Sequence, residues 1–148
     1  MVDRQAVIDL INHGAIAYDT SDLDFLLEMY LDEDAELSLT VDSADSVFLR
    51  DKNSILKFFT DALEKRTALR RHVITNTYFE KETENTVTAI SCIHLVGIDD
   101  GTVNILASGT YTDDCIEVGG KWKIKKREVT MVSAVSQRSE LLRKAGLE

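Results

Sequence analysis

An aspartate and a histidine far apart in the sequence could together carry out acid–base chemistry. Asp19 stands at the end of an apolar helical stretch, and His72 lies early in a run of residues typical of a β-strand. An imidazole titrates near neutral pH, so a histidine can take up and release protons under physiological conditions. A carboxylate beside the ring raises its basicity enough to remove a proton from carbon or oxygen. The pair is therefore a candidate general acid/base, provided that the fold brings the two residues together.

The elements that would position this pair begin with three helices. Apolar side chains recur at three- and four-residue spacing in three stretches, which predicts amphipathic helices. The first extends from about Asp3 to Tyr18, directly before Asp19. The second follows capping residues at 20–24, and the third begins at 51–54.

The second half of the chain has the pattern of a β-sheet. Two short strands are expected earlier, at 35–41 and 47–49. From Leu69 onward four longer runs are rich in β-branched and aromatic residues, and glycine-containing turns between the last three indicate hairpins. The four runs cover residues 69–80, 86–98, 102–117 and 121–135.

These elements predict an α+β fold in a single domain, residues 1–135. A four-stranded meander and the two short strands would form a curved antiparallel sheet packed on the three helices. Strands of this length twist and bend, so the sheet would close into a cone-shaped α+β barrel with an internal pocket. The remaining residues, 136–148, form a tail for which a short helix is the expected structure.

Composition and charge argue against several classes of partner. The chain has 148 residues, enough for one domain, and a formal net charge of −9 at pH 7. Nucleic acids and anionic membranes would repel it, and it contains no long apolar run or signal-peptide pattern. Two cysteines without a disulfide framework favour a reducing, cytoplasmic location. Three scattered histidines, without a CxxC or HExxH motif, predict no metal site.

Four short motifs, taken with the order of the elements, point to a known group of proteins. They are Tyr18-Asp19, Arg71-His72 with Asn76, Gly109-Thr110-Tyr111-Thr112-Asp113, and Gly120-Lys121-Trp122-Lys123-Ile124 followed by Arg127. The chain resembles the nuclear-transport-factor-like superfamily over about residues 4–134. Within it the chain is similar to the SnoaL-like group, which includes polyketide cyclases, scytalone dehydratase and a hexachlorocyclohexane dehydrochlorinase. The superfamily also contains binding and scaffold domains, so the fold alone does not imply catalysis.

The resemblance implies catalytic roles for Asp19 and His72. They match the aspartate and histidine of the dehydratase and the dehydrochlorinase, in which the histidine is the general base and the aspartate fixes its tautomer. Each residue also has an ordinary structural explanation. Asp19 could satisfy backbone donors in the turn before the second helix, and His72 could be a core or edge histidine. Their joint match favours a real dyad.

Four further residues are candidates for substrate binding: Tyr18, Asn76, Tyr111 and Arg127. By resemblance, Tyr18 matches a tyrosine that binds substrate through water, and Arg127 matches a pocket arginine of the dehydrochlorinase. Asn76 and Tyr111 fall on strands that should line the cone. Each of the four could equally pack, satisfy buried backbone groups or be solvated. Simple alternation groups Arg127 with the lysines of its strand, so a pocket role requires a bulge or bend there.

Two departures from the related enzymes bear on the type of reaction. The second catalytic histidine of the dehydratase aligns nearer to Ser91 than to His94. The lysine that assists the dehydrochlorinase has no counterpart in 14–17, so haloalkane elimination is not supported.

Two hypotheses about function remain. The first is a cofactor-free dehydratase, isomerase or cyclase acting on a small apolar carbonyl or hydroxyl compound through the Asp19–His72 dyad. The second is a non-catalytic module of the same fold that binds a ligand or serves in assembly. The resemblance implies a homo-oligomer, a dimer or trimer, in both cases.

Overall fold

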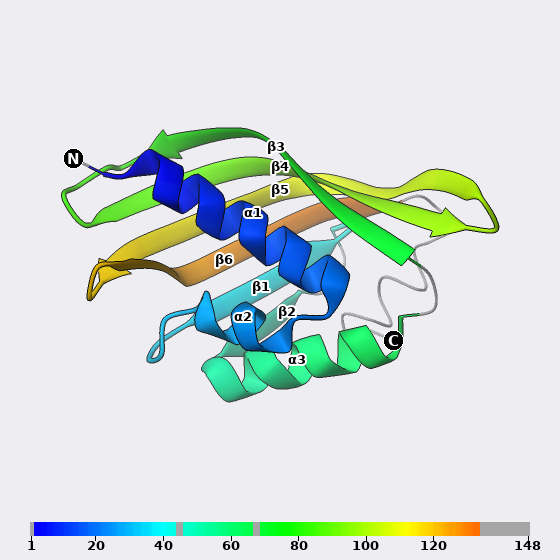
Figure 1. Cartoon of the computed structure of the whole chain (residues 1–148), viewed down its shortest axis with the longest axis horizontal. Coiled ribbons are helices and arrows are strands. Elements are labelled where there is room, and N and C mark those ends of the chain that lie inside the picture. Colours follow the sequence, from blue (N-terminus) through cyan, green and yellow to red (C-terminus); the bar gives the residue numbers. More distant parts are fainter. Residues whose placement is uncertain (1, 44–45, 67–68, 134–148) are drawn as a thin grey trace.

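The computed structural model describes residues 2–43, 46–66 and 69–133. Figure 1 shows three helices on one side of a twisted sheet of six strands. The helices are α1 (Arg4–Thr20), α2 (Leu23–Glu28) and α3 (Lys52–Glu64). The strands are β1 (Glu36–Val41), β2 (Val47–Arg50), β3 (Leu69–Glu80), β4 (Thr86–Asp99), β5 (Thr102–Val118) and β6 (Lys121–Ser133). The tail expected at 136–148 lies outside the described residues.

Aspartate side chains begin all three helices. The carboxylates of Asp3, Asp22 and Asp51 each accept a hydrogen bond from the backbone N–H three residues ahead, at 3.0, 3.1 and 2.9 Å. These caps satisfy donors that the first turn of a helix leaves free. The sequence contains no proline, so such caps and left-handed residues set the helix boundaries. At the end of α1, Ser21 adopts a left-handed conformation with φ of 62°.

The sheet has the strand order β2-β1-β6-β5-β4-β3. Strands β3 to β6 form the expected antiparallel meander. The expectation that the whole sheet is antiparallel is wrong, because β1 pairs with β6 in parallel. Residue patterns predict a strand but not its neighbour, and β1 joins a strand that lies about 90 residues further along the chain. The result is an α+β fold with a mixed sheet.

Three β-bulges curve the sheet. The pairing registers shift between β3 and β4, between β4 and β5, and between β5 and β6. Each bulge adds an unpaired residue and increases the local bend. The concave face of the sheet turns toward the helices, with α1 lying across β3 to β6 and α3 near β2 (Figure 1).

The core lies between the helices and the concave face. Buried side chains come from both layers, including Val7 and Ile11 of α1, Ile55 of α3 and Ile93 of β4. Strands β5 and β6 approach so closely at Gly109 that a Cβ there would lie 1.9 Å from the Thr130 carbonyl oxygen. Glycine is therefore required at this close approach of two strands. Among the described helices, none has the length and apolar character needed to span a bilayer.

Candidate active site

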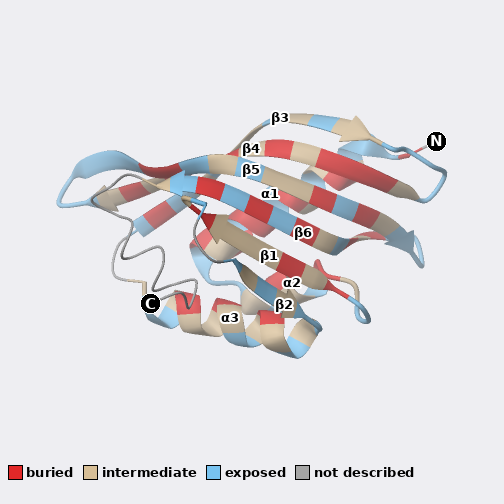
Figure 2. Cartoon of the chain, turned by 180° about the vertical axis from the view of Figure 1, so that it is seen from behind, coloured by how far each residue is buried: buried red, intermediate tan, exposed pale blue. Residues whose placement is uncertain are grey.

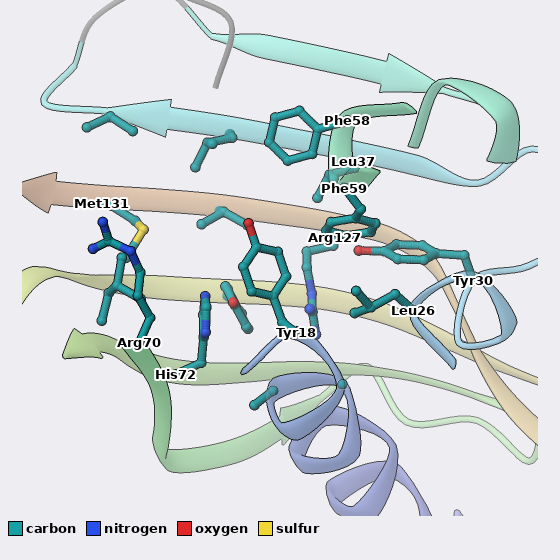
Figure 3. Close-up of a pocket in the computed structure, with 17 residues that line it drawn as sticks. Tyr18, Leu26, Tyr30, Leu37, Phe58, Phe59, Arg70, His72, Arg127 and Met131 are labelled. Atoms are coloured by element: carbon teal, nitrogen blue, oxygen red, sulfur yellow. The ribbon is translucent and has the colours of Figure 1, made fainter. Parts of the chain in front are cut away.

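A pocket opens between the helices and the concave face of the sheet. It encloses a cavity of about 110 Å³ and has mainly apolar walls, formed by side chains such as Leu26, Phe58 and Met131 (Figure 3). A few polar side chains interrupt this lining: Tyr18, Tyr30, Arg70, His72, Tyr111 and Arg127. An apolar cavity with a small number of converging polar groups is the usual form of a small-molecule site.

Asp19 and His72, which are 53 residues apart in sequence, are in direct contact. The Asp19 Oδ1 atom lies 2.7 Å from the His72 Nδ1 atom. Both carboxylate oxygens also lie 3.1 Å from the backbone nitrogen of His72, which donates to them. The carboxylate is 4% exposed and the imidazole 12%. One aspartate thus holds both the ring and the main chain of the histidine.

This contact determines which nitrogen of His72 is available for chemistry. An ionised carboxylate can only accept hydrogen bonds, so Nδ1 carries a proton. In the neutral ring the other nitrogen, Nε2, then has a free lone pair. His72 lines the pocket, so this lone pair is available to a bound molecule.

The end of α1 is fixed by Arg66. Its guanidinium donates to the carbonyl oxygens of Tyr18 and Asp19, at 3.1 and 3.3 Å, and to the Ser21 hydroxyl at 3.0 Å. A cation at a helix C-terminus satisfies the last carbonyls and opposes the helix dipole. Arg66 therefore holds the turn of helix from which Asp19 reaches His72.

Tyr18 packs directly against the histidine. Its ring meets the His72 ring edge-on, with centroids 4.5 Å apart, and meets Phe59 at 5.7 Å. Burial raises the pKa of Tyr18 to about 12, so its hydroxyl stays protonated at neutral pH. Tyr18 can therefore donate a hydrogen bond beside the imidazole.

Arg127 reaches the pocket because β6 contains a bulge. Cys115 pairs with Ile124, but its neighbour Asp114 pairs with Lys126, so Lys125 is an extra residue. The bulge reverses the alternation of β6. Before the bulge the even-numbered residues of β6 point inward, and after it the odd-numbered residues do. Arg127 therefore points inward and is only 6% exposed. The bulge required for a pocket position of Arg127 is therefore present.

A buried carboxylate holds the Arg127 guanidinium in place. Asp113, which is fully buried, accepts from Nε at 2.7 Å and from Nη2 at 2.9 Å. The guanidinium lies over the ring of Tyr111, 4.1 Å from its centroid. Burial alone would lower the pKa of Arg127, but the neighbouring groups, Asp113 first among them, together raise the pKa above its usual value. Arg127 is thus a fixed positive charge on the pocket wall.

Asn76 does not reach the pocket, and the prediction that it lines the cone is not met. Its side chain is exposed, its φ is 57°, and it lies in the bulge between Thr75 and Tyr78. Simple alternation from His72 would point residue 76 inward. Because of the bulge, Thr77 points inward in place of Asn76, and its hydroxyl lies 2.9 Å from the Ser91 hydroxyl.

Three pocket-region residues were not predicted as site residues. Arg70 is buried and lines the pocket, and the alternation that places His72 inward also places Arg70 inward. Asp113 lies two residues after Tyr111, but only its cross-strand pairing with Arg127 reveals its role. The apolar spacing placed Tyr30 on the buried face of the second helix. In the structure it follows the end of α2 and turns its hydroxyl toward the pocket.

The second histidine of the meander lies away from the pocket. His94 pairs with Val73, on the convex face, and its Nδ1 lies 3.0 Å from the Ser108 hydroxyl. Ser91 is one of the buried residues on the concave face of β4. Over the described part of the chain, no three histidine, cysteine, aspartate or glutamate side chains gather closely enough to hold a metal ion.

Comparison with known proteins identifies relatives of the fold. A family model described as the SnoaL-like domain matches residues 1–128. None of the curated proteins matches the chain significantly.

Solved structures of similar fold share low sequence identity with the chain. A proposed aromatic ring hydroxylase from Novosphingobium aromaticivorans is 22% identical, with a TM-score of 0.77, and the match covers 97% of this chain and 96% of the other. A proposed scytalone dehydratase from the same bacterium is 18% identical, with a TM-score of 0.73 and coverage of 87% and 83%. ActVI-ORFA from Streptomyces coelicolor is 18% identical, with a TM-score of 0.73 and coverage of 86% and 96%. At these identities the likeness concerns the fold.

Proposed function

Because the chain belongs to the SnoaL-like domain family, we propose that it is a cofactor-free acid–base enzyme of the dehydratase, isomerase or cyclase type. Its substrate is a small, largely apolar molecule with a carbonyl or hydroxyl group. The observation that carries this proposal is the 2.7 Å contact between Asp19 and His72 on the wall of an apolar pocket. A structural relative described as a proposed scytalone dehydratase agrees with this class of reaction.

In the proposed reaction His72 is the general base. Its Nε2 removes a proton from the carbon next to a substrate carbonyl, and the C–H electron pair moves to form an enolate. The resulting imidazolium is stabilised by Asp19 at Nδ1. Expulsion of a hydroxyl group, protonated by the imidazolium, then releases water. Return of the proton to another carbon gives isomerisation, and attack of the enolate on a second carbonyl gives cyclisation.

Two groups on the pocket wall would stabilise the negative charge that develops, Tyr18 by direct contact and Arg127 through its charge. Tyr18 donates a hydrogen bond beside His72, and Arg127 contributes a fixed positive charge. Tyr111 lies against the guanidinium and helps to position it. Such groups are most effective where water is excluded and the donors are already in place.

Exchange of substrate hydrogen in heavy water tests this proposal. One- and two-ring hydroxy-ketones are incubated with the protein in D₂O, and deuterium uptake and loss of water are followed by mass spectrometry. Replacing Asp19 with asparagine should slow the reaction about 10²-fold or more, since the amide no longer fixes the tautomer or supports the imidazolium. A rate unaffected by Asp19→Asn would contradict the dyad. Binding of these compounds without exchange or elimination would instead favour a ligand-binding module.

We further propose that the convex face of the sheet is buried in a homo-oligomer. Figure 2 shows the sheet from this face. Several apolar side chains on it are exposed in the single chain, among them Val103 at 65%, Ile105 at 64% and Val132 at 68%. Neighbouring exposed apolar side chains on a sheet mark an interaction surface.

The mass of the protein in solution checks this expectation. The parent should sediment as a dimer or trimer, and replacing both Ile105 and Val132 with glutamate should yield monomers, because the charges cannot be buried against a second copy. Asn12→Glu, at an exposed site on α1, is the matched control and should leave the mass unchanged. A monomeric parent would rule out the oligomer.

A further inference from the structure

Tyr30 is fixed at one end of the pocket by both main-chain and side-chain contacts. It follows α2 and forms a parallel bridge with Ile124 of β6. The Ile124 N–H donates to the Met29 carbonyl at 2.7 Å, and the Leu31 N–H donates to the Ile124 carbonyl at 2.9 Å. The ring packs against Phe59, with centroids 6.1 Å apart, and the residue is fully buried. Figure 3 shows its hydroxyl directed into the pocket.

The Tyr30 hydroxyl lacks a hydrogen-bond partner among the described residues, although it is shielded from bulk water. Buried hydroxyl groups nearly always have a partner, because leaving one unsatisfied is unfavourable. Phenylalanine would fill the same space in this apolar wall without that cost. The hydroxyl therefore requires an explanation that packing does not provide.

The neighbouring Arg127 cannot accept a hydrogen bond from the Tyr30 hydroxyl. Burial raises the pKa of Tyr30 far above its usual value, an effect that nearby Arg127 only partly offsets, so the phenol keeps its proton. A guanidinium has only donors and cannot accept this proton. Asp113 occupies the Nε and Nη2 edge of the guanidinium, and Nη1 lies on the opposite side. At this end of the pocket, the Tyr30 hydroxyl is a hydrogen-bond donor without an acceptor, and the Arg127 guanidinium beside it carries a fixed positive charge.

We propose that Tyr30 and Arg127 form a subsite for a second oxygen atom of the substrate. The oxygen is a hydrogen-bond acceptor, such as a carbonyl or ring ether, and the Tyr30 hydroxyl donates to it. Figure 3 places this end of the pocket apart from His72, with Tyr18 between them. The substrate is accordingly a compact ring compound with two oxygen functions, one beside His72 and one at Tyr30. The assignment of the first oxygen rests on the proposed function, whereas the binding of the second does not require turnover.

Two ketones of nearly identical shape test the subsite. 1-Tetralone has a carbonyl as its only oxygen, and 4-chromanone carries an additional ether oxygen in place of one ring CH₂ group. Binding of each to the parent, to Tyr30→Phe and to Tyr78→Phe is measured by NMR titration. The parent should bind 4-chromanone about threefold to tenfold more tightly than 1-tetralone, as expected for one added hydrogen bond. Tyr30→Phe should lose this preference, and Tyr78→Phe, on the convex face, should keep it.

Thermal unfolding distinguishes a subsite from a structural role. The Tyr30 hydroxyl donates to no described protein group, so Tyr30→Phe should melt at the temperature of the parent or above. A lower melting temperature together with an unchanged ligand preference would overturn the proposal. A buried water that stays on Tyr30 in a crystal structure with 4-chromanone bound would also overturn it.

The same measurements separate this inference from the proposed function. The preference for 4-chromanone should persist in His72→Gln, because binding at Tyr30 does not need the base. If the Tyr30-dependent preference is found but no compound reacts, the subsite holds and the proposed reaction fails. If turnover depends on His72 but Tyr30→Phe keeps the parent's preference, the reaction holds and the subsite fails.

Discussion

Replacing Asp113 with alanine is expected to lower the free energy of unfolding by about 3–5 kcal/mol. The carboxylate is fully buried and accepts two hydrogen bonds from Arg127, which is itself only 6% exposed. Without it the guanidinium would be a buried charge with no counter-charge beside it. The loss can be measured by urea denaturation, using the midpoint and slope of the unfolding curve.

A double variant provides the control for this prediction. Changing Asp113 to leucine and Arg127 to methionine removes both charges and leaves apolar side chains of similar size. Such replacements of a buried ion pair are often neutral or stabilising, so the double variant should regain most of the lost stability. A loss of less than about 1 kcal/mol in Asp113→Ala, the range of exposed ion pairs, would contradict the buried character of this pair.

Replacing His72 with glutamine is expected to lower kcat/KM for the best hydroxy-ketone of the panel by about 10²–10⁴-fold. Glutamine keeps a polar side chain of similar length but has no group that takes up a proton near neutral pH. The backbone N–H of residue 72 can still donate to Asp19, so the fold should survive. Steady-state rates are compared after circular dichroism has confirmed the secondary structure.

The neighbouring strand offers a matched control. His94→Gln makes the same substitution on the convex face, where the ring contacts Ser108 and not the pocket. Its rate should equal that of the parent within about twofold, as for a surface change outside the site. If His72→Gln retained a rate similar to that of His94→Gln, another group would have to be the base.

The sequence predicted the fold well where local pattern decides the structure. Three-to-four-residue apolar spacing and aspartate caps indicated the helices, and glycine turns indicated the meander. The parallel pairing of β1 with β6 was missed, because alternation is the same in parallel and antiparallel strands. Which strand becomes a neighbour depends on the packing of the whole chain.

The candidate site was predictable only in part, because bulges decide which side chains face the pocket. Resemblance to a family, not periodicity, suggested the proximity of Asp19 and His72, whose contact the structure contains. Asn76 was expected at the pocket because its strand should line the cone, and alternation grouped Arg127 with outward lysines. One bulge in each strand changes the side on which each residue lies. A bulge has no strong signature in a single sequence, so the position of Arg127 could be stated only as conditional on one.

The contact between Asp19 and His72 has a consequence for how the protein folds. It joins α1 to β3 across 53 residues, and Arg127 reaches the same pocket from β6. Contacts between distant parts of a chain form slowly, because a large loop must close before any of them contributes. The pocket is consequently complete only when β6 has docked, and no shorter N-terminal fragment contains all of its walls. A growing chain is thus without the whole site until β6 has been synthesised.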